Sequence, residues 1–347
     1  MQRVYLDYNA TSPLRAEARA AMIAAMDALG NPSSVHAEGR AAKAIVEKAR
    51  GQISEAVGAS GADIIFTSSA TEAAALALSG RGIAGAAIEH DAVRAYSDAT
   101  LPVDRHGRVA LSDPAASTLQ LANSETGVMQ ELPPGVAVSD FTQAFGKVPV
   151  SFAWSGVEMA LVSAHKLGGP KGVGALIVRQ GVDVPALIRG GGQEMGRRSG
   201  TENVIGIAGF GAAAEAAQRD LETGVWSRVE EFRNILEITL EGFARDIIFV
   251  GKSAPRLPNT SCFIAPGWKG ETQVMQMDLA GFAVSAGSAC SSGKVKASGV
   301  LTAMGHGAEA AAQAIRVSIG PATTEEDVRR FAETWAAKYE RVRARAA

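Results

Sequence analysis

Lys166 is the first residue of interest, because it follows the apolar run 159–163 and leads directly into the Gly-Gly-Pro turn at 168–170. Ser163 and His165 stand beside it, at the point where the run ends. A lysine withdrawn from water at such a place has a lowered pKa and can form a Schiff base. Most lysines are merely solvated, so this residue needs support from its neighbours.

Two other apolar runs also end in polar residues. The first leads into Ala70 and Thr71, where the start of a helix offers free N–H groups and a hydroxyl to a phosphate. A plain serine or threonine N-cap is the simpler interpretation. The second run ends at Asp140, with Gln143 three residues later, and a carboxylate there more often caps a helix than takes part in catalysis.

The two cysteines, Cys262 and Cys290, are too few for a disulfide framework or a four-cysteine zinc site. Cys290 lies among small polar residues between Gly287 and Gly293, which favours an accessible, reactive thiolate in a loop. Cys262 lies in a hydrophobic run, which is typical of a core residue. The histidines have no metal-ligand spacing, so we expect no metal.

Composition limits the possible partners. The 347 residues include 34 basic and 36 acidic side chains, and no block of like charges offers a surface to nucleic acid or to an anionic membrane. The longest apolar runs are far shorter than the roughly 18 residues that a membrane span needs, and the first residues do not resemble a signal peptide. We therefore expect a cytoplasmic protein that acts on a small molecule.

The elements that position these residues have the pattern of an α/β domain. Buried strands are expected at 63–67, 119–123, 136–140, 159–163 and 174–178. Helices are expected at 16–29, with Met22, Met26 and Leu29 on its apolar face, and at 41–57. This alternation predicts a mostly parallel sheet, with ligands beyond the carboxyl ends of its strands.

The second half of the chain has a different pattern. A long helix with an apolar face from Val229 to Phe243 leads to strand-like runs at 261–264 and 315–319 and to a last helix that begins near Thr324. We therefore expect a large domain at 14–225 and a smaller α+β domain made of 1–13 and 226–347.

A phosphate cradle, an acid, a lysine and glycine-rich turns are together what pyridoxal phosphate requires. Their order and context resemble the cysteine desulfurase branch of the class V aminotransferases, along nearly the whole length, from 5–13 through 30–36 to 323–326. The resemblance implies the pyridoxal-phosphate fold of type I, with a mostly parallel sheet of the seven-stranded type in the large domain and the catalytic cysteine loop in the small one.

The resemblance also implies a role for each polar residue. Lys166 carries pyridoxal 5'-phosphate as a Schiff base, and Asp140 pairs with the ring nitrogen. Gln143 binds the ring hydroxyl, while His90 stacks on the ring and helps to transfer protons. The implied phosphate ligands are Ala70, Thr71, Ser163 and His165, together with Thr201 of a second subunit in a homodimer.

On the substrate side, the resemblance implies that Arg316 binds the carboxylate of L-cysteine and that Asn123 contacts the cofactor or the substrate. Lys166 removes the α-proton, and the Cys290 thiolate then attacks the substrate sulfur. Alanine is released and a persulfide remains on the enzyme. A sulfur-acceptor protein would take this sulfur for iron–sulfur clusters or thio-cofactors.

The chain departs from the family pattern at Ser124, Met195 and Pro321, and its segment 101–140 is shorter than expected. Two alternatives stay open. The chain could be a lyase or transaminase acting on a related amino acid such as selenocysteine. It could also be a scaffold that retains the fold with little activity.

Overall fold

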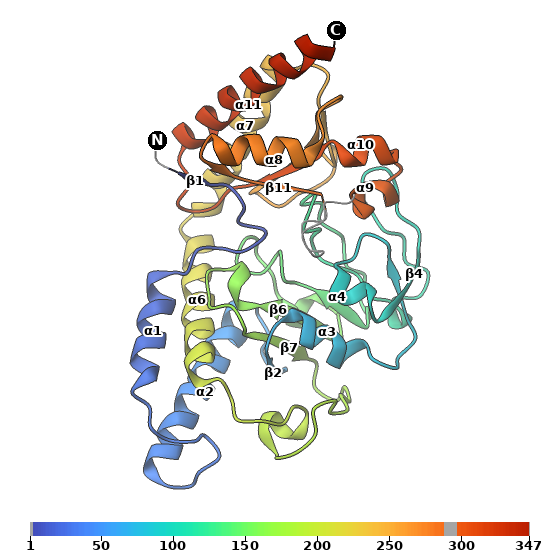
Figure 1. Cartoon of the computed structure of the whole chain (residues 1–347). Coiled ribbons are helices and arrows are strands. Elements are labelled where there is room, and N and C mark those ends of the chain that lie inside the picture. The colour runs from blue at the N-terminus through green and yellow to red at the C-terminus, as the bar shows by residue number, and fades with distance from the viewer. Residues whose placement is uncertain (1–2, 288–296, 347) are drawn as a thin grey trace.

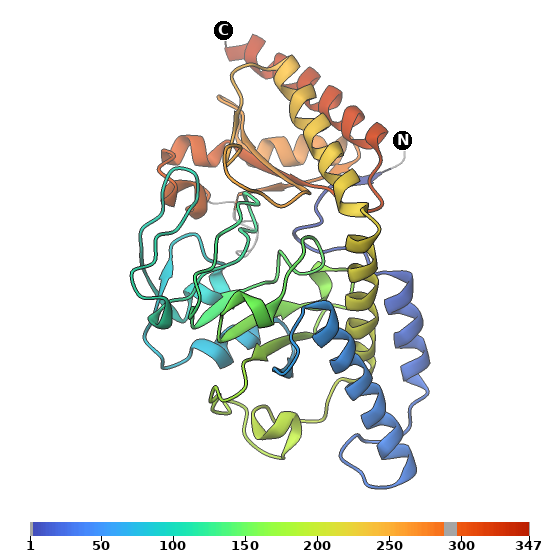
Figure 2. The same cartoon turned by 180° about the vertical axis from the view of Figure 1, so that it is seen from behind.

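The structure is a computed structural model that describes residues 3–287 and 297–346. The predicted nucleophile Cys290 lies outside the described residues. Figures 1 and 2 show two parts, one above the other: a lower part with the main sheet and the N-terminal helices, and an upper part that contains both described ends of the chain. No helix in the described ranges combines the length and the apolar character needed to cross a membrane.

The main sheet contains four strands in the order β2 (Asp63–Thr67), β7 (Gly174–Val178), β6 (Met159–Ser163) and β5 (Val138–Asp140). The strand β7 runs antiparallel to both of its neighbours, while β5 and β6 are parallel. All five residues of β6 and of β7 are buried, which explains why these strands are apolar without alternation.

The sheet continues beyond β5 through the extended segment 117–121. The Leu119 amide donates to the Val138 carbonyl at 3.1 Å, and the Thr118 amide donates to the Ala84 carbonyl at 2.8 Å. This segment thereby joins β5 to β3 (Ile83–Ala86), which pairs in parallel with β4 (Ser97–Leu101). The α/β fold with a mostly parallel sheet is thus confirmed, although the sequence did not reveal β3 or β4.

Three helices pack beside this sheet: α1 (Ala16–Met26), α2 (Ala37–Ala56) and α6 (Val204–Glu222). Sequence reasoning missed α6 because the helix buries residues on most of its circumference and therefore has no apolar stripe. Its glycines also reduce its helix propensity, but they permit close packing. A Cβ at Gly211 would lie 2.6 Å from the Ala49 Cα of α2.

The apolar face predicted for the first helix is partly wrong. The helix α1 packs through Ala18 and Ala25, whereas Met26 and Leu29 are 60% and 90% exposed. The helix ends at Met26, so Leu29 does not belong to it. Contact with α6 selects the small residues, because two helices approach closely only where their side chains are short.

The upper part contains an antiparallel sheet in the order β11 (Ser285–Ala286), β12 (Ala314–Ser318), β9 (Thr260–Ile264) and β8 (Ile248–Phe249). The pair β1 (Val4–Tyr5) and β10 (Phe282–Ala283) is parallel. The longer helices are α7 (Val225–Phe243), α8 (Gly270–Leu279) and α11 (Glu325–Ala346). Its short helices are α9 (Gly299–Ala303) and α10 (Ala308–Ala312). Three further short helices belong to the lower part: α3 (Ala70–Leu78), α4 (Asp91–Arg94) and α5 (Phe152–Ser155), which lies between β5 and β6 in the chain.

Two large apolar clusters lie in different parts of the chain. One takes its buried residues from Ala18 to Ala217, and the other from Val4, Leu6 and the stretch from Trp226 to Tyr339. In Figure 2, α6 and α7 follow one another along the side of the molecule and connect the two parts. The domain boundaries themselves stay a prediction.

Candidate functional site

A cavity of about 240 Å³ opens at the carboxyl ends of β5 and β6, beside the start of α3. Its position agrees with the rule that ligands in open α/β sheets bind beyond the strand ends. Eight of the predicted site residues line its wall, and we call this set the strand-end rim. They are Ala70, Thr71, His90, Asp140, Gln143, Ser163, His165 and Lys166.

The helix α3 turns its N-terminus toward the cavity. Its N-cap is Ser69, whose hydroxyl accepts the Glu72 amide at 3.4 Å, and Glu72 is paired with Arg198 at 2.8 Å. The first amides of a helix have no partner within the helix and carry partial positive charge. Ala70 and Thr71, the first two residues of α3, therefore present an anion-binding surface to the cavity.

The carboxylate and one histidine of the strand-end rim are held by local backbone contacts. One Asp140 carboxylate oxygen accepts the Thr142 amide at 2.8 Å. His90 is the N-cap of α4, and its Nδ1 accepts the Ala92 amide at 3.1 Å. In the neutral imidazole the proton must then lie on Nε2, because Nδ1 is an acceptor.

Lys166 lies one turn beyond the end of β6. Its Nζ donates to the Asn9 carbonyl at 2.6 Å and to the Ala10 carbonyl at 3.0 Å. The neighbouring His165 has its Nδ1 3.2 Å from the Thr11 hydroxyl. Burial, with the added repulsion of Lys166, lowers the pKa of His165 to about 4, so this imidazole is neutral at pH 7.

The N-terminal segment supplies a residue that sequence reasoning did not single out, Asn9. Its side-chain oxygen accepts from Lys147 Nζ and from Asn259 Nδ2, both at 3.0 Å. Its Nδ2 donates to the Ser124 carbonyl at 3.2 Å and to the Thr260 hydroxyl at 2.9 Å. Asn9 thus joins both parts of the molecule.

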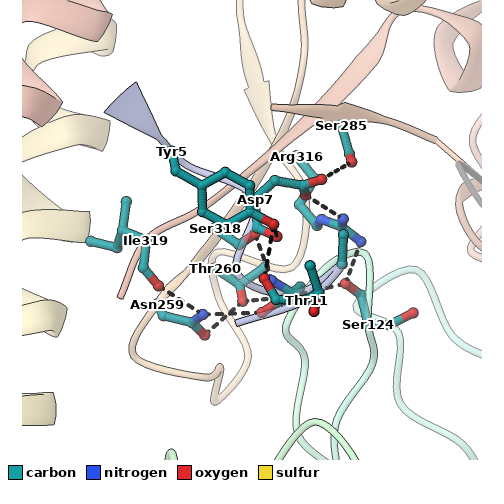
Figure 3. A network of polar contacts seen from close by, with 12 residues as sticks. Tyr5, Asp7, Thr11, Ser124, Asn259, Thr260, Ser285, Arg316, Ser318 and Ile319 are labelled. Carbon is teal, nitrogen blue, oxygen red and sulfur yellow. Dashed lines mark hydrogen bonds and ion pairs between the residues drawn. The ribbon is translucent and has the colours of Figure 1, made fainter. Parts of the chain in front are cut away.

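Arg316 on β12 belongs to the same network. It forms an ion pair with Asp7 at 2.7 Å and donates to the Ser124 carbonyl at 3.0 Å, and Ser285 donates to the other oxygen of Asp7 at 2.8 Å (Figure 3). The buried Nε of Arg316 has no partner among the described residues.

We call the long-range contacts made by Asn9 and Arg316 the Asn9 seam. Its members are Asp7, Asn9, Ser124, Asn259, Thr260, Ser285 and Arg316.

The structure does not bring every predicted residue to the cavity wall. Arg316 is buried near it but does not line it, and Thr201 is exposed and also lies outside the wall. Asn123 is buried, and both ends of its amide bind backbone: Nδ2 donates to the Ile88 carbonyl at 3.0 Å, and the oxygen accepts the Glu125 amide at 2.9 Å. In this structure Asn123 therefore does not line the cavity but supports its wall through these backbone contacts.

Cys262 is the one cysteine that the structure describes, and it is a core residue. It is 2% exposed in β9, and burial raises its pKa to about 12. Such a thiol remains protonated at neutral pH and is not a nucleophile.

Sequence reasoning also missed two buried charged groups beside the strand-end rim, Lys147 and Glu89. Lys147 is 1% exposed. Glu89 accepts the Gln120 amide at 2.7 Å, and its Oε2 has no partner among the described residues. Burial, reinforced by Asp140, raises the pKa of Glu89 to about 8. The sequence did offer a signal for both residues, because each lies close to a motif. Glu89 directly precedes His90, and Lys147 follows Gln143 by four residues.

Comparison with known proteins places this geometry in a family. The sequence profile of the aminotransferase class V family matches residues 4–94 and 113–331. The chain is 39% identical to a cysteine desulfurase of Cereibacter sphaeroides, over 96% of this chain and 95% of that protein. It is 36% identical to the cysteine desulfurase IscS of Dictyoglomus turgidum, over 94% of this chain and 92% of that protein.

Solved structures give the same result. A NifS-like protein from Rickettsia africae superposes with a TM-score of 0.89 at 31% identity, covering 98% of this chain and all of that one. A structure described as SspA in complex with cysteine superposes with a TM-score of 0.75 at 25% identity, covering 92% of this chain and all of that one. Fold, cavity and sequence agree, and the chain belongs to the class V aminotransferase family.

Proposed function

We propose that the protein is a pyridoxal-phosphate-dependent cysteine desulfurase, which converts L-cysteine to L-alanine and retains the sulfur as a persulfide on Cys290. The observation that carries this proposal is the strand-end rim. Eight polar and helix-start residues chosen from sequence line one cavity. The relatives named as cysteine desulfurases match nearly the whole chain, which supports the same reaction here.

The residues on the cavity wall fit the cofactor. The α3 start at Ala70 and Thr71, with Ser163, offers amides and hydroxyls to a phosphate, and neutral His165 can donate one hydrogen bond to it. Asp140 would hold the proton of a ring nitrogen. Once bound, the cofactor supplies an electron sink for the carbanion at the substrate Cα.

Lys166 and His90 would handle protons. Both line the cavity, so Lys166 Nζ can take the proton from the substrate Cα. His90 lines the cavity, and its Nδ1 accepts the Ala92 amide, which fixes the orientation of the imidazole for a second proton transfer. In this proposal Lys166 removes the proton from the substrate Cα, and His90 carries out a second proton transfer.

Arg316 would bind the substrate carboxylate. Its guanidinium is positioned by Asp7 and Ser124 at the Asn9 seam and has one N–H, at Nε, that no described residue accepts. A buried donor without an acceptor is costly, and a carboxylate would satisfy it. Asn123 would support this end of the site by holding the 123–126 turn.

The sulfur-accepting residue follows by elimination. Of the two cysteines, Cys262 is buried and protonated. The described residues on either side of Cys290 are held near Arg316. Ser285 binds Asp7, the partner of Arg316, and Ser298 donates to Glu125 at 2.5 Å. Described residues on both sides of Cys290 thus lie close to the arginine that would bind the substrate carboxylate, which supports Cys290 as the sulfur acceptor.

A homodimer and a sulfur-acceptor protein complete the proposal. Three large apolar side chains on and just after α1 are exposed to solvent: Ile23, Met26 and Leu29. Their exposure favours burial against a second copy of the chain. Thr201, exposed in this chain, would then reach the phosphate in the partner. Sedimentation of the purified protein tests this, and a monomer at micromolar concentration would contradict it.

The decisive experiment mixes the protein with pyridoxal phosphate, L-cysteine and a reductant. We expect equal amounts of alanine and sulfide. Cys290→Ala should abolish sulfide release while keeping the visible absorption band of the bound cofactor. The matched control Cys262→Ala should retain sulfide release.

Two results would contradict the proposal. Sulfide release by Cys290→Ala at the parental rate would exclude this residue as the sulfur acceptor. Turnover that requires pyruvate would favour an aminotransferase instead. Comparing L-cysteine with L-selenocysteine decides between a desulfurase and a selenocysteine lyase.

A further inference from the structure

Lys147 is a buried lysine without a counter-ion. It lies in the turn after β5 and is 1% exposed. Among the described residues no carboxylate pairs with it, and its Nζ instead donates to the Gln143 side-chain oxygen at 2.6 Å and to the Asn9 side-chain oxygen at 3.0 Å. Burial, with repulsion from Lys166 and Arg316, places its pKa well below the ordinary value.

Stability does not explain this residue. Taking an amine out of water without a counter-ion is costly, and an apolar side chain of similar length would avoid the cost. The turn nevertheless brings Lys147 directly behind the site. Gly146, with a φ of 77°, packs so closely that a Cβ there would lie 3.2 Å from the Cβ of Leu167, the residue after Lys166.

Two contacts of Gln143 fix the orientation of its amide. The Asn9 carbonyl can only accept a hydrogen bond, so the NH₂ group of Gln143 must face it, and the amide oxygen of Gln143 then faces Lys147, which donates to it. The distance from Gln143 Nε2 to the Asn9 carbonyl oxygen is 3.0 Å. Because Gln143 lines the cavity, its second N–H remains for a ligand.

The same carbonyl connects Lys147 to Lys166. The Asn9 main-chain oxygen accepts both Gln143 Nε2 and Lys166 Nζ, while the Asn9 side chain accepts Lys147. Lys147 therefore contacts the side chains of Asn9, which accepts Lys166, and of Gln143, which shares that acceptor. Lys147 itself is not among the residues that line the cavity.

We propose that Lys147 is a positioning residue. It fixes the Gln143 amide so that this amide donates a hydrogen bond to the ring oxygen of the cofactor and favours the ionised form of that oxygen. The inference rests on the proposed function, since it needs pyridoxal phosphate in the cavity. It assigns no contact between Lys147 and the cofactor or the substrate.

The test compares Lys147→Met with the parent and with Lys269→Met, which removes an exposed lysine at the start of α8. Three quantities are measured: the dissociation constant of pyridoxal phosphate, the pH at which the visible band of the loaded protein changes, and the melting temperature of the cofactor-free protein. Only the first two depend on the orientation of Gln143.

For Lys147→Met we expect cofactor binding about tenfold weaker and a band midpoint about one pH unit higher, because a donor to an ionised oxygen is lost. The melting temperature of the cofactor-free protein should be unchanged or higher. Lys269→Met should match the parent in all three. Unchanged cofactor binding and an unchanged band midpoint would overturn the proposal, whatever the melting temperature.

A double-mutant cycle separates positioning from a general effect on the fold. If Lys147 acts through Gln143, then Lys147→Met should weaken cofactor binding no further in a Gln143→Leu background. Additive losses would overturn the proposal. A parent protein that takes up no pyridoxal phosphate would instead contradict the proposed function, and this inference with it.

Discussion

The strand-end rim and the Asn9 seam meet at Lys166, but they are held together differently. In the strand-end rim, Asp140 and His90 are each bound to backbone two residues along the chain, and Ser69, the N-cap before Ala70, is bound to backbone three residues along it. In the Asn9 seam, Asn9 binds Asn259 and Asp7 binds Arg316, contacts between residues about 250 and 309 positions apart. The contacts of Asp140 and His90 can form with the sheet, whereas the Asn9 seam needs both parts of the molecule in place. Gln143, His165 and Lys166 lie between these cases, because each of them contacts the N-terminal segment 9–11.

This difference decides how much the sequence could predict. Residues of the strand-end rim follow strands that their apolar runs reveal, so Lys166, Asp140 and Ala70 were identified as one site. Asn9, Lys147 and Glu89 were missed because nothing near them in the chain tells which distant groups they bind. The parallel sheet was predictable in the same way, while α6 was not, since burial on most faces leaves no stripe.

The variant with the largest expected effect breaks the Asn9 seam. Asp7→Asn leaves Arg316 buried without its counter-ion, and we expect the free energy of unfolding to fall by about 3 kcal/mol. The KM for L-cysteine should rise, because Arg316 loses its orientation. Urea unfolding and steady-state kinetics measure the two effects.

A control for this variant comes from a second buried pair. Glu237 and Arg256 are 2.7 Å apart and at least as buried, but they are not members of the Asn9 seam. Glu237→Gln should destabilise the protein by a similar amount and leave KM unchanged. An equal rise of KM in both variants would show that stability alone controls substrate binding.

The second effect tests the buried acid behind the strand-end rim. The pKa of Glu89 is about 8 in the folded protein, against an ordinary 4.5. Between pH 5 and pH 8 the unfolded chain has mostly lost this proton while the folded one keeps it, so the contribution of Glu89 to stability should fall by about 3 kcal/mol. Glu89→Gln, which cannot ionise, should remove that fall.

At acidic pH a second group, His165, changes stability in the opposite direction. His165 has a folded pKa of about 4 against an ordinary 6.5, so its contribution to stability is present above pH 6.5 and is lost as the pH falls toward 4. Urea titrations at pH 5, 6.5 and 8 therefore separate the two groups. An identical pH profile for Glu89→Gln and the parent would be incompatible with a protonated Glu89.

A smaller effect is expected at the start of α3. Ser69→Ala removes the N-cap and should cost about 1 kcal/mol of stability. Because the change loosens the turn that we propose to bind the phosphate, pyridoxal phosphate should also bind more weakly, while the KM for L-cysteine stays near the parental value once cofactor is saturating. A change confined to KM would assign α3 to the substrate end.

The smallest effect provides the baseline. Arg3 pairs with Asp278 on the surface, with both side chains more than half exposed. Exposed ion pairs contribute little, so Arg3→Ala should change the free energy of unfolding by less than about 0.5 kcal/mol and leave cofactor binding unchanged. A loss above 1 kcal/mol would show that the N-terminal strand anchors the Asn9 seam more strongly than its contacts suggest.

The kind of atom that accepts from Lys166 has a consequence for any saturation mutagenesis of this protein. Lys166 donates to the main-chain oxygens of Asn9 and Ala10, and every amino acid possesses this atom. Replacing residue 9 removes the amide that reaches Lys147 and Thr260 but leaves the oxygen that receives the lysine. Genetic scans will therefore understate the importance of this position, and only a change of the peptide path itself, by insertion or deletion within 5–13, can move the atom.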